Sequence, residues 1–505
     1  MRCICAGLST VLGAALVVLG GLTIVYYEPF VNKLIYEQMQ IKNGTEMFEN
    51  FVRPPVVPYL QIYFFNVTNH EEFLQGSKPM LQEVGPYSYR QEWEKVNVTI
   101  HANGTISSAL KKTYFFDREK SVGPESDQVT VLNVPMVTAV WQVRFTPRFI
   151  QLIFSSMLEV LKERPFATHN ISELVWGYED PLLKMARDIL PPHQRMPSDS
   201  FGFFNNQNGS ANLLLNQFLG SVEDMSQYLQ IDWANRENYL DYWLTDECNR
   251  VHGSDGSGWP PNINRTDTLY IFNKALCRAL PLTFERDIEQ YGIKGYRFTP
   301  PKNVFADVSV NPENECYCVG GPPCLGGGLF NASICQFGSP AVVSWPHFYQ
   351  ADKKYLDAVD GLSPDPEKHS FFVDLSPRTG VPLAAEGKIQ INMALTNVSE
   401  IKPANGLRPM IFPVVWFQDG VPRMPDEVIE KLRMVSNLPE TIKITILTLS
   451  FVFGCVMLVG GITIFVTMCS ACVSDSDDES TDPNTLSRLH GHTNPTMDTK
   501  YPEKD

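Results

Sequence analysis

The sequence lacks the motifs by which most enzymes are identified. It contains no GxSxG nucleophile elbow, no Walker phosphate-binding loop and no HExxH zinc-protease motif. Acidic residues are spread along the chain, so no glycosidase-type pair of carboxylates stands out. Histidine is scarce, with nine in 505 residues, and we interpret His169 and His347 as structural side chains. We therefore expect the chain to be no enzyme and to need no cofactor.

Positive charge is also in short supply. The chain has 41 lysine and arginine residues against 56 acidic residues, which gives a formal net charge of −15. Nucleic-acid binding needs clustered basic side chains, so this balance argues against a nucleic-acid partner. No CxxC pair or run of histidines accompanies the cysteines in the middle of the chain. A metal site is therefore not expected.

What the sequence does contain is two long runs without a charged residue, at residues 4–27 and 444–468. At about 1.5 Å per residue, either run crosses a hydrocarbon core of roughly 30 Å as a helix. A cleaved signal peptide is the alternative for the first run, but the run is longer than an ordinary signal core and no clear small-x-small site ends it. We predict a cytoplasmic N-terminus (1–3), a transmembrane helix (4–27), one lumenal or extracellular domain (28–443), a second transmembrane helix (444–468) and an acidic cytoplasmic tail (469–505).

Glycosylation sequons indicate the orientation. Nine Asn-x-Ser/Thr sequons occur, all between the two apolar runs, where about three or four would arise by chance. Such an excess is typical of a domain that folds in the secretory pathway and carries glycans on its surface. The predicted acceptors are Asn43, Asn66, Asn97, Asn103, Asn170, Asn208, Asn264, Asn331 and Asn397.

The eleven cysteines divide in the same way. Six lie between the apolar runs, an even number that predicts three disulfides in an oxidising compartment. Six cysteines allow 15 pairings, and here only a bond between Cys316 and Cys318 is disfavoured, because so small a ring strains disulfide geometry. Four other cysteines lie at the predicted cytoplasmic faces, where they are either S-palmitoylated or unmodified thiols. These four are Cys3, Cys5, Cys469 and Cys472.

Between the apolar runs, strand-like segments dominate. Residues 59–68 are rich in aromatic and β-branched side chains, and Gly85-Pro86-Tyr87 is expected to form a turn. Residues 388–396 alternate apolar and polar side chains, which predicts a half-buried antiparallel strand. The glycine-rich residues 253–258 are interpreted as a flexible loop. The pattern favours a β-rich body in the form of a barrel.

One segment interrupts the strands with a helical pattern. Thr146 as N-cap and Pro147 in the first turn precede apolar residues at helical spacing, so we predict a helix over residues 149–162. Basic residues near its ends make this helix amphipathic. Two interpretations remain: the helix packs on a neighbour such as residues 180–190, or it offers a surface to a partner or to lipid.

Several motifs together resemble the class B scavenger receptor family. They are the strand YFFNVTN, EVGPYSYR at residues 83–90, WGYEDP at 176–181, PHFYQAD at 346–352 and VDLSPRTG at 373–380, in addition to the two apolar runs and the six central cysteines. The resemblance covers nearly all of the predicted external domain. The segments KNGTEMFENF, YFFNVTN, CLGGGLFNASIC and PHFYQAD are most similar to the lysosomal integral membrane protein branch of this family.

The resemblance implies a fold and a binding site. The fold is a membrane-anchored α+β protein, with a large antiparallel β-barrel ectodomain, an apical helical bundle and a hydrophobic tunnel. The disulfides it implies are Cys248–Cys316, Cys277–Cys335 and Cys318–Cys324. The lysosomal branch keeps fewer cysteines here, so the cysteine set is more similar to that of cell-surface members. The apex helix is the implied ligand site, at Arg144, Arg148, Phe149, Ile150, Ile153, Phe154, Met157, Lys162 and Arg164.

The implied function is that of a scavenger-type receptor. It would bind lipids (sterol, phospholipid or fatty acid), lipoprotein particles or other anionic ligands at the apex, and mediate their endocytosis or lipid transfer through the tunnel. The alternatives are a sorting receptor that carries a soluble lysosomal hydrolase, and an adhesion receptor. Self-association into a homo-oligomer is also left open.

Targeting signals in the tail bear on the location. The tail lacks a dileucine signal, since Leu486 is followed by Ser487, and Tyr501 lacks the bulky apolar residue that a tyrosine sorting signal requires. We therefore expect a two-pass protein of the cell membrane with both termini cytoplasmic. The endosome or lysosome membrane is the alternative location.

Overall fold

The computed structural model describes residues 2–189, 198–321 and 324–478. The chain divides into two compact units, one within residues 1–30 and 440–505 and the other within residues 31–439. Two long helices, α1 (Arg2–Met39) and α11 (Asp426–Asp478), continue past the apolar runs, so each contributes to both units. Their segments Ala6–Met39 and Asp426–Met468 are long and apolar enough to cross a membrane. Leu486 and Tyr501, where the sequence lacks sorting signals, lie outside the described residues.

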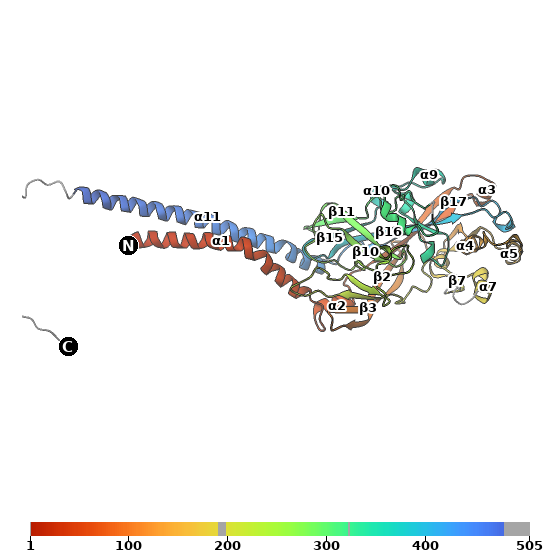
Figure 1. Ribbon diagram of the computed structural model, residues 1–505, viewed down its shortest axis with the longest axis horizontal. Coiled ribbons are helices and arrows are strands. Elements are labelled where there is room, and N and C mark those ends of the chain that lie inside the picture. The colour runs from red at the N-terminus through yellow and green to blue at the C-terminus, as the bar shows by residue number, and fades with distance from the viewer. Residues whose placement is uncertain (1, 190–197, 322–323, 479–505) are drawn as a thin grey trace, which may run out of the picture. The chain divides into compact units, whose positions relative to one another are not determined.

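In the first unit, α1 and α11 pack against each other through small residues (Figure 1). A Cβ atom on Gly13 would come within 2.7 Å of the backbone nitrogen of Leu458 and 2.9 Å of the carbonyl oxygen of Gly454. The Ser9 hydroxyl donates to the carbonyl of Met457 at 3.2 Å. Because lipid provides no hydrophobic force between helices, close approach at small residues is what holds such helices together. The packing is therefore that of a membrane helix pair.

The second unit is built on one large antiparallel sheet (Figure 1). Its strands follow the path β10-β11-β12-β15-β16-β17-β1-β2-β3-β8-β9, and β14 also pairs with β16 and with β13. The strands are β1 (Tyr59–Val67), β2 (Leu81–Ile100), β3 (Thr105–Asp117), β8 (Leu214–Phe218), β9 (Ile231–Ala234), β10 (Leu269–Asn273), β11 (Arg278–Gln290), β12 (Ile293–Thr299), β13 (Phe330–Asn331), β14 (Ala341–Ser344), β15 (Phe372–Leu375), β16 (Pro382–Leu395) and β17 (Met410–Val421).

The antiparallel pairing predicted for the barrel is confirmed, but strand pairing does not close the barrel. Among the described residues, the edge strands β9 and β10 do not pair with each other. Instead, the segment Gly253–Ser254 bonds to both edges: the amide of Ile231 donates to the carbonyl of Gly253 at 2.8 Å, and Ser254 exchanges backbone hydrogen bonds with Tyr270 and Phe272 at 2.9 Å each. A two-residue segment thus takes the place of the strand ladder that would close a barrel.

This segment belongs to the glycine-rich residues 253–258, which form a loop but not the flexible one that the sequence predicted. Ser254 is fully buried, and the carboxylate of Asp255 forms an ion pair with Lys95 of β2 at 3.0 Å. Gly253 has a φ of +90°, and a Cβ atom there would come within 2.7 Å of β10. The glycine is therefore required by close packing, whereas the prediction took it as a sign of mobility.

The turn predicted at Gly85-Pro86-Tyr87 is also wrong. These residues lie inside β2, which continues from Leu81 to Ile100, and the irregularity is taken up by a register shift against β1 between Ile62 and Phe64. A Cβ atom on Gly85 would come within 2.8 Å of the Ile62 carbonyl oxygen, so glycine permits this close approach.

The strand predicted at residues 388–396 is confirmed as part of β16, but it is not half-buried. Its polar side chains Lys388, Gln390 and Asn392 are at most 2% exposed. Gln390 donates to the side chain of Asn392 at 2.7 Å, and Lys388 pairs with Glu386 at 2.7 Å. The polar face is therefore satisfied by other protein groups, which alternation along the sequence does not reveal.

Short helices and two small sheets surround the large sheet. Figure 1 shows α4, α5 and α7 grouped at one end of this unit, near β7. The helices of this unit are α2 (Glu46–Val52), α3 (His70–Leu74), α4 (Val134–Val143), α5 (Arg148–Leu161), α6 (Ile171–Trp176), α7 (Pro181–Ile189), α8 (Asp246–Asn249), α9 (Lys353–Asp357), α10 (Pro366–His369), and the 3-10 turns η2 (Pro312–Tyr317), η3 (Ser333–Cys335), η4 (Pro346–Phe348) and η5 (Lys402–Ala404). The small sheets pair β4 (Gln128–Leu132) with β5 (Phe166–Asn170), and β6 (Tyr178–Glu179) with β7 (Ser200–Phe201).

Candidate functional site

The predicted ligand-binding helix is α5, which spans Arg148–Leu161 and so lies one residue earlier than predicted at each end. Thr146 is not its N-cap. The cap is Pro147, because the Thr146 hydroxyl instead donates to the carbonyl of Val143 at 2.7 Å, at the end of α4. The helix ends where Lys162 takes a left-handed conformation with a φ of +58°. This geometry satisfies the last carbonyls of the helix without a glycine.

One face of α5 is fixed to the protein by polar side chains. The amide of Gln151 donates to the carbonyls of Arg144 and Thr146 at 3.0 and 3.1 Å, which caps the end of α4. The hydroxyl of Ser155 accepts from the amide of Lys402 in η5 at 3.0 Å. Both polar side chains are buried, and the helix also contacts α7, as one of the two sequence interpretations expected. The position of α5 is therefore set by directional bonds as well as by packing.

The opposite face of α5 is apolar and exposed. Its four large apolar residues recur at helical spacing, with Phe149 at 62%, Leu152 at 44%, Ile153 at 64% and Val160 at 81% exposure. We call these four residues the outer face of α5. Phe145, just before the helix, is 85% exposed. Since a soluble surface rarely exposes so many neighbouring apolar side chains, this face has the character of a binding surface.

The structure divides the predicted apolar ligand residues into two groups. Phe149 and Ile153 belong to the outer face, and Ile150 is half-buried beside it. Phe154 and Met157 instead pack against the hydrophobic core that contains Leu158 and strands of the large sheet. The ligand contacts of Phe154 and Met157 stay a prediction, since both side chains pack against this core and are only partly exposed.

The predicted basic residues surround the outer face in different ways. Arg148 is exposed and pairs with Glu400 at 3.1 Å. The guanidinium of Arg144 lies over the rings of Trp141 and Phe145, with its carbon 3.7 and 4.3 Å from their centroids. Lys162 and Arg164 are both exposed at the other end of the helix. The outer face therefore has positive charge at both ends.

Two buried carboxyl groups lie below the end of α5. Burial raises the pKa of Glu163, although a hydrogen bond of 2.7 Å from the amide of Asn133 opposes the shift. Burial also raises the pKa of Asp180, whose carboxylate accepts from the amide of Leu183 at the start of α7. The charge of Asp180 also raises the pKa of Glu163, so acidification removes negative charge beneath this helix.

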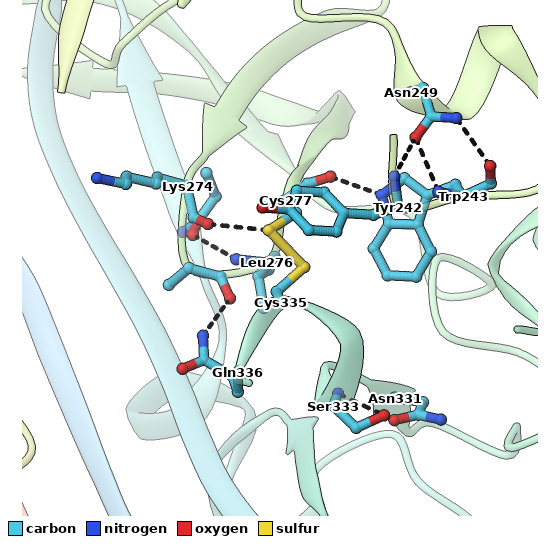
Figure 2. Close-up of a disulfide and its surroundings, with 12 residues drawn as sticks. Tyr242, Trp243, Asn249, Lys274, Leu276, Cys277, Asn331, Ser333, Cys335 and Gln336 are labelled. Atoms are coloured by element: carbon cyan, nitrogen blue, oxygen red, sulfur yellow. Dashed lines mark hydrogen bonds between the residues drawn. A yellow bond between two sulfur atoms is a disulfide. The ribbon is translucent and has the colours of Figure 1, made fainter. Parts of the chain in front are cut away.

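The disulfides lie away from α5, around a second hydrophobic core. The structure pairs Cys248 with Cys316, Cys277 with Cys335 and Cys318 with Cys324, which are the three pairs that the resemblance implied. Figure 2 shows the second of these bonds beside Trp243, whose indole donates to the carbonyl of Cys277 at 2.6 Å. Asn249 fixes the Trp243 backbone from the other side, through hydrogen bonds of 2.8 Å.

The predicted glycosylation sites all lie at accessible positions. None of the nine asparagines is buried, and those at half-buried positions use their side-chain oxygen as an acceptor, as when Asn170 caps α6. A glycan attaches to the side-chain nitrogen, so these hydrogen bonds are compatible with modification. The four candidate palmitoylation sites Cys3, Cys5, Cys469 and Cys472 fall within the backbone of α1 and α11, but their side chains lie outside the described part of the chain.

Sequence reasoning missed a cluster in which three of the resembling motifs meet, with buried imidazole and indole rings around the partly exposed carboxylate of Glu83. The carboxylate of Glu83 accepts from the indole of Trp416 at 2.7 Å and lies 2.5 Å from Nε2 of His347. The ring of His347 stacks on His369 with 4.4 Å between centroids, and Tyr63 stacks on Trp416 at 3.8 Å. The only sequence signal was that EVGPYSYR, PHFYQAD and YFFNVTN occur together, which gives no distances.

The neighbours of this cluster define the protonation of its imidazoles. The amides of Ser363 and Asp365 donate to Nδ1 of His347 and His369, at 3.0 and 2.9 Å. Each ring proton is therefore on Nε2, which in His347 faces Glu83. Burial, with the neighbouring imidazole, lowers the pKa of His369 to about 4. Burial alone would raise the pKa of Glu83, but the hydrogen bonds that it accepts lower it. Within the described residues, no three His, Cys, Asp or Glu side chains converge as a metal site requires.

A surface pocket of about 330 Å³ lies beside the CLGGGL segment. Its lining mixes positive and negative side chains, with Lys302 and Lys354 near Asp307 and Asp352. It is therefore too polar to be part of the apolar tunnel that the resemblance implies.

Comparison with known proteins places these features in a family. A sequence model of the CD36 family matches residues 11–465. Lysosome membrane protein 2 of Rattus norvegicus is 36% identical over 433 residues, which cover 85% of this chain and 88% of that protein. The Homo sapiens protein of the same name is 35% identical over 436 residues, covering 85% and 89%. Scavenger receptor class B member 1 of Sus scrofa is 34% identical over 409 residues, covering 81% and 79%.

Proposed function

Because this chain belongs to the CD36 family, we propose that it is a two-pass membrane receptor that captures lipid-bearing or anionic ligands at the outer face of α5. The observation that carries the proposal is the exposure of that face, which reaches 64% at Ile153 and 81% at Val160. An apolar helix face of this kind gains free energy when a partner covers it, at about 25 cal/mol for each Å² of apolar surface buried.

The charge around the outer face favours an anionic ligand. Arg144, Arg148, Lys162 and Arg164 stand at its two ends, in a protein whose net charge is −15. A local positive rim attracts phospholipid headgroups, fatty-acid carboxylates or acidic protein surfaces, while the apolar residues between contact lipid tails or an amphipathic helix. Lipoprotein particles, which present both kinds of surface, fit this combination, and their capture leads to endocytosis or lipid transfer.

Lipid transfer requires a path that water does not enter. Each methylene group exposed to water costs about 0.8 kcal/mol, so an apolar conduit lowers the barrier to transfer without a chemical step. We propose that the conduit runs through the body formed by the large sheet. The antiparallel path of the sheet, with the segment Gly253–Ser254 bonded to both edge strands, supports a barrel-like body.

The topology that we propose places residues 28–443 outside the cytoplasm and both termini inside it. Nine accessible sequons and three disulfides support this assignment, since both modifications belong to the secretory pathway. The α4, α5 and α7 group would then form the apical bundle. The cell membrane is the proposed location. Palmitoylation of the four flanking cysteines and assembly into a homo-oligomer remain part of the proposal.

The test is ligand capture by the full-length protein on cells. We expect Ile153→Glu to abolish binding of fluorescent lipoprotein particles and of anionic phospholipid vesicles, because it places a charge at the centre of the outer face. Val122→Glu is the matched control, since Val122 is 59% exposed and lies after β3. Surface expression of both variants is measured with an antibody. Equal ligand binding by Ile153→Glu and wild type would rule out this face as the site.

A second function is favoured by the similarity to lysosome membrane protein 2. In this alternative, the outer face of α5 carries a soluble lysosomal hydrolase through the secretory pathway, and the endosome or lysosome membrane is the destination. The buried Glu163 and Asp180 would then help to release the hydrolase on acidification. Affinity purification of the full-length protein at pH 7.4 and pH 5 tests it. We expect a hydrolase to bind stoichiometrically at pH 7.4 and not at pH 5. If no hydrolase co-purifies, this alternative is wrong, and the protein is a lipid receptor or an adhesion receptor without lipid transfer.

A further inference from the structure

The large sheet contains three cations whose residues are at most 5% exposed, namely Lys95, Arg278 and Lys388. Two of them are neutralised. Lys95 pairs with Asp255 at 3.0 Å, and Lys388 pairs with Glu386 at 2.7 Å. Arg278, the first residue of β11, differs from both. Within the described chain, its Nε and Nη1 atoms are buried and have no hydrogen-bond partner.

The surroundings of Arg278 are aromatic. Its guanidinium carbon lies 3.8 Å from the ring centroid of Tyr317 and 5.1 Å from that of Phe330. Trp243 contacts both rings, at 5.0 and 5.5 Å between centroids. Cation–π contacts of this kind stabilise the charge, but they lie over the faces of the rings and leave the N–H groups in the guanidinium plane unsatisfied.

The disulfides hold this arrangement in place. Arg278 directly follows Cys277, which is bonded to Cys335 next to Trp243 (Figure 2). Tyr317 stands between Cys316 and Cys318, each of which belongs to another disulfide. The disulfides therefore restrain the backbone next to Arg278 and on both sides of Tyr317.

An arginine in this environment needs a counter-charge. The arginine side chain stays protonated in proteins, so it cannot escape the cost of burial by losing its proton. An unpaired buried ion costs several kcal/mol. Glu247 and Glu313, whose charges influence Tyr317, are exposed, and neither pairs with Arg278. Water would satisfy the N–H groups but would leave the charge uncompensated.

We propose that Arg278 and the rings around it bind a small monovalent anion of the chloride type. A single guanidinium matches one negative charge, whereas phosphate or sulfate would require further donors or a second cation. The close edge-to-face contacts among Trp243, Tyr317 and Phe330 favour an ion of atomic size, and the positive edges of the rings add to its stabilisation. The site is structural and independent of ligand capture at α5.

The first test uses circular dichroism to measure the thermal unfolding of the full-length protein in detergent micelles. Sodium chloride is titrated against sodium gluconate at constant ionic strength. We expect the Tm of the wild type to rise saturably with chloride by about 2 °C or more. Arg278→Met should show no such rise. Arg297→Met is the matched control, since Arg297 is a partly buried arginine that already has a partner, Asp374, at 2.7 Å. It should be less stable but should keep the chloride dependence.

Two results would overturn the proposal. One is a chloride dependence that is absent in the wild type or equal in Arg278→Met. The other is stabilisation by sodium acetate or sodium phosphate but not by sodium chloride, which would mean that a carboxylate or phosphate is the anion. Because variants of a disulfide-linked core can misfold, a wild-type crystal soaked in sodium bromide provides an independent measurement. An anomalous bromide peak within hydrogen-bond distance of Nε and Nη1 is expected, and its absence would contradict the site.

Discussion

At the scale of single residues, buried charges are the costliest feature of the large sheet. The ion pair between Lys95 and Asp255 connects β2 to the loop that bonds to both sheet edges, and Lys95 also donates to Gln217 at 3.2 Å. Burial alone would raise the pKa of Asp255, but Lys95 lowers it, so the carboxylate stays charged. The pair therefore stabilises the fold at neutral pH only while both partners are present.

This pair gives the first prediction. Asp255→Asn leaves Lys95 as an unpaired buried cation, so we expect the free energy of unfolding to fall by about 3–5 kcal/mol. The double variant Lys95→Met with Asp255→Leu removes both charges, so its free energy of unfolding should fall clearly less than that of Asp255→Asn. Chemical denaturation at pH 7.4, followed by tryptophan fluorescence, measures both. Equal losses in the single and double variants would show that the charges are not coupled.

A second prediction concerns Glu163, whose pKa is raised by burial. The folded state favours the protonated form of such a carboxyl group. The ionised form therefore destabilises the fold, and this penalty grows as the pH rises through the folded pKa. Glu163→Gln keeps an acceptor for the Asn133 amide and removes the charge. We expect it to stabilise the protein at pH 7.4 and to have almost no effect near pH 4. A gain that does not depend on pH would contradict this account.

At the scale of elements, the two faces of α5 explain what sequence reasoning could and could not provide. The helix, its amphipathic character and its ends to within one residue follow from apolar spacing and from Pro147. The spacing does not tell which apolar residues face solvent, because apolar residues cover more than one side of the helix. The side that is buried depends on the elements that pack against the helix. Gln151 and Ser155 make that selection, and neither was a predicted contact. The prediction therefore grouped Phe154 with Ile153.

These two adjacent residues provide a matched test. Phe154 packs against the hydrophobic core, whereas Ile153 is 64% exposed. Phe154→Glu places an unpaired carboxylate against the core at a half-buried position, so we expect a loss of about 1–3 kcal/mol in stability and lower surface expression. Ile153→Glu should change the free energy of unfolding by less than about 0.5 kcal/mol. Thermal unfolding of the purified full-length variants compares them, and similar losses would mean that the outer face is covered in the native protein.

At the scale of the whole molecule, long-range features limited the sequence prediction. The two apolar helices and the antiparallel body were predictable, since length and alternation are local properties of the chain. The bonding of Gly253–Ser254 to both edge strands was not, because it depends on contacts between separate segments of the chain. The buried polar face of β16 and the cluster around Glu83 were missed for the same reason. In both cases the partner is His347 of η4, whose backbone amide donates to Gln390 of β16 and whose ring faces Glu83 of β2.

The cluster around Glu83 links the stability of the unit formed by residues 31–439 to pH. His369 has a pKa of about 4 in the folded protein, against about 6.5 when unfolded. The folded state favours the neutral form of a base whose pKa is lowered on folding. The stability is therefore greatest above the pKa of the unfolded state, and it falls as the pH decreases towards the pKa of the folded state. By pH 5 this amounts to about 2 kcal/mol. His369→Asn keeps an acceptor for the Asp365 amide but cannot be protonated, so its stability should fall less between pH 7.4 and pH 5.

Thermal unfolding of wild type and His369→Asn at pH 7.4, 6 and 5 measures this difference directly. The two proteins must be compared with each other, because Glu163 and Asp180 favour the folded state on acidification and partly hide the effect in either protein alone. Parallel stability profiles would show that His369 does not govern the acid response. A steeper fall in the wild type would mean that lysosomal pH weakens the unit formed by residues 31–439. Since a resident of the lysosome membrane has to stay folded near pH 5, that outcome favours the cell membrane as the site of function.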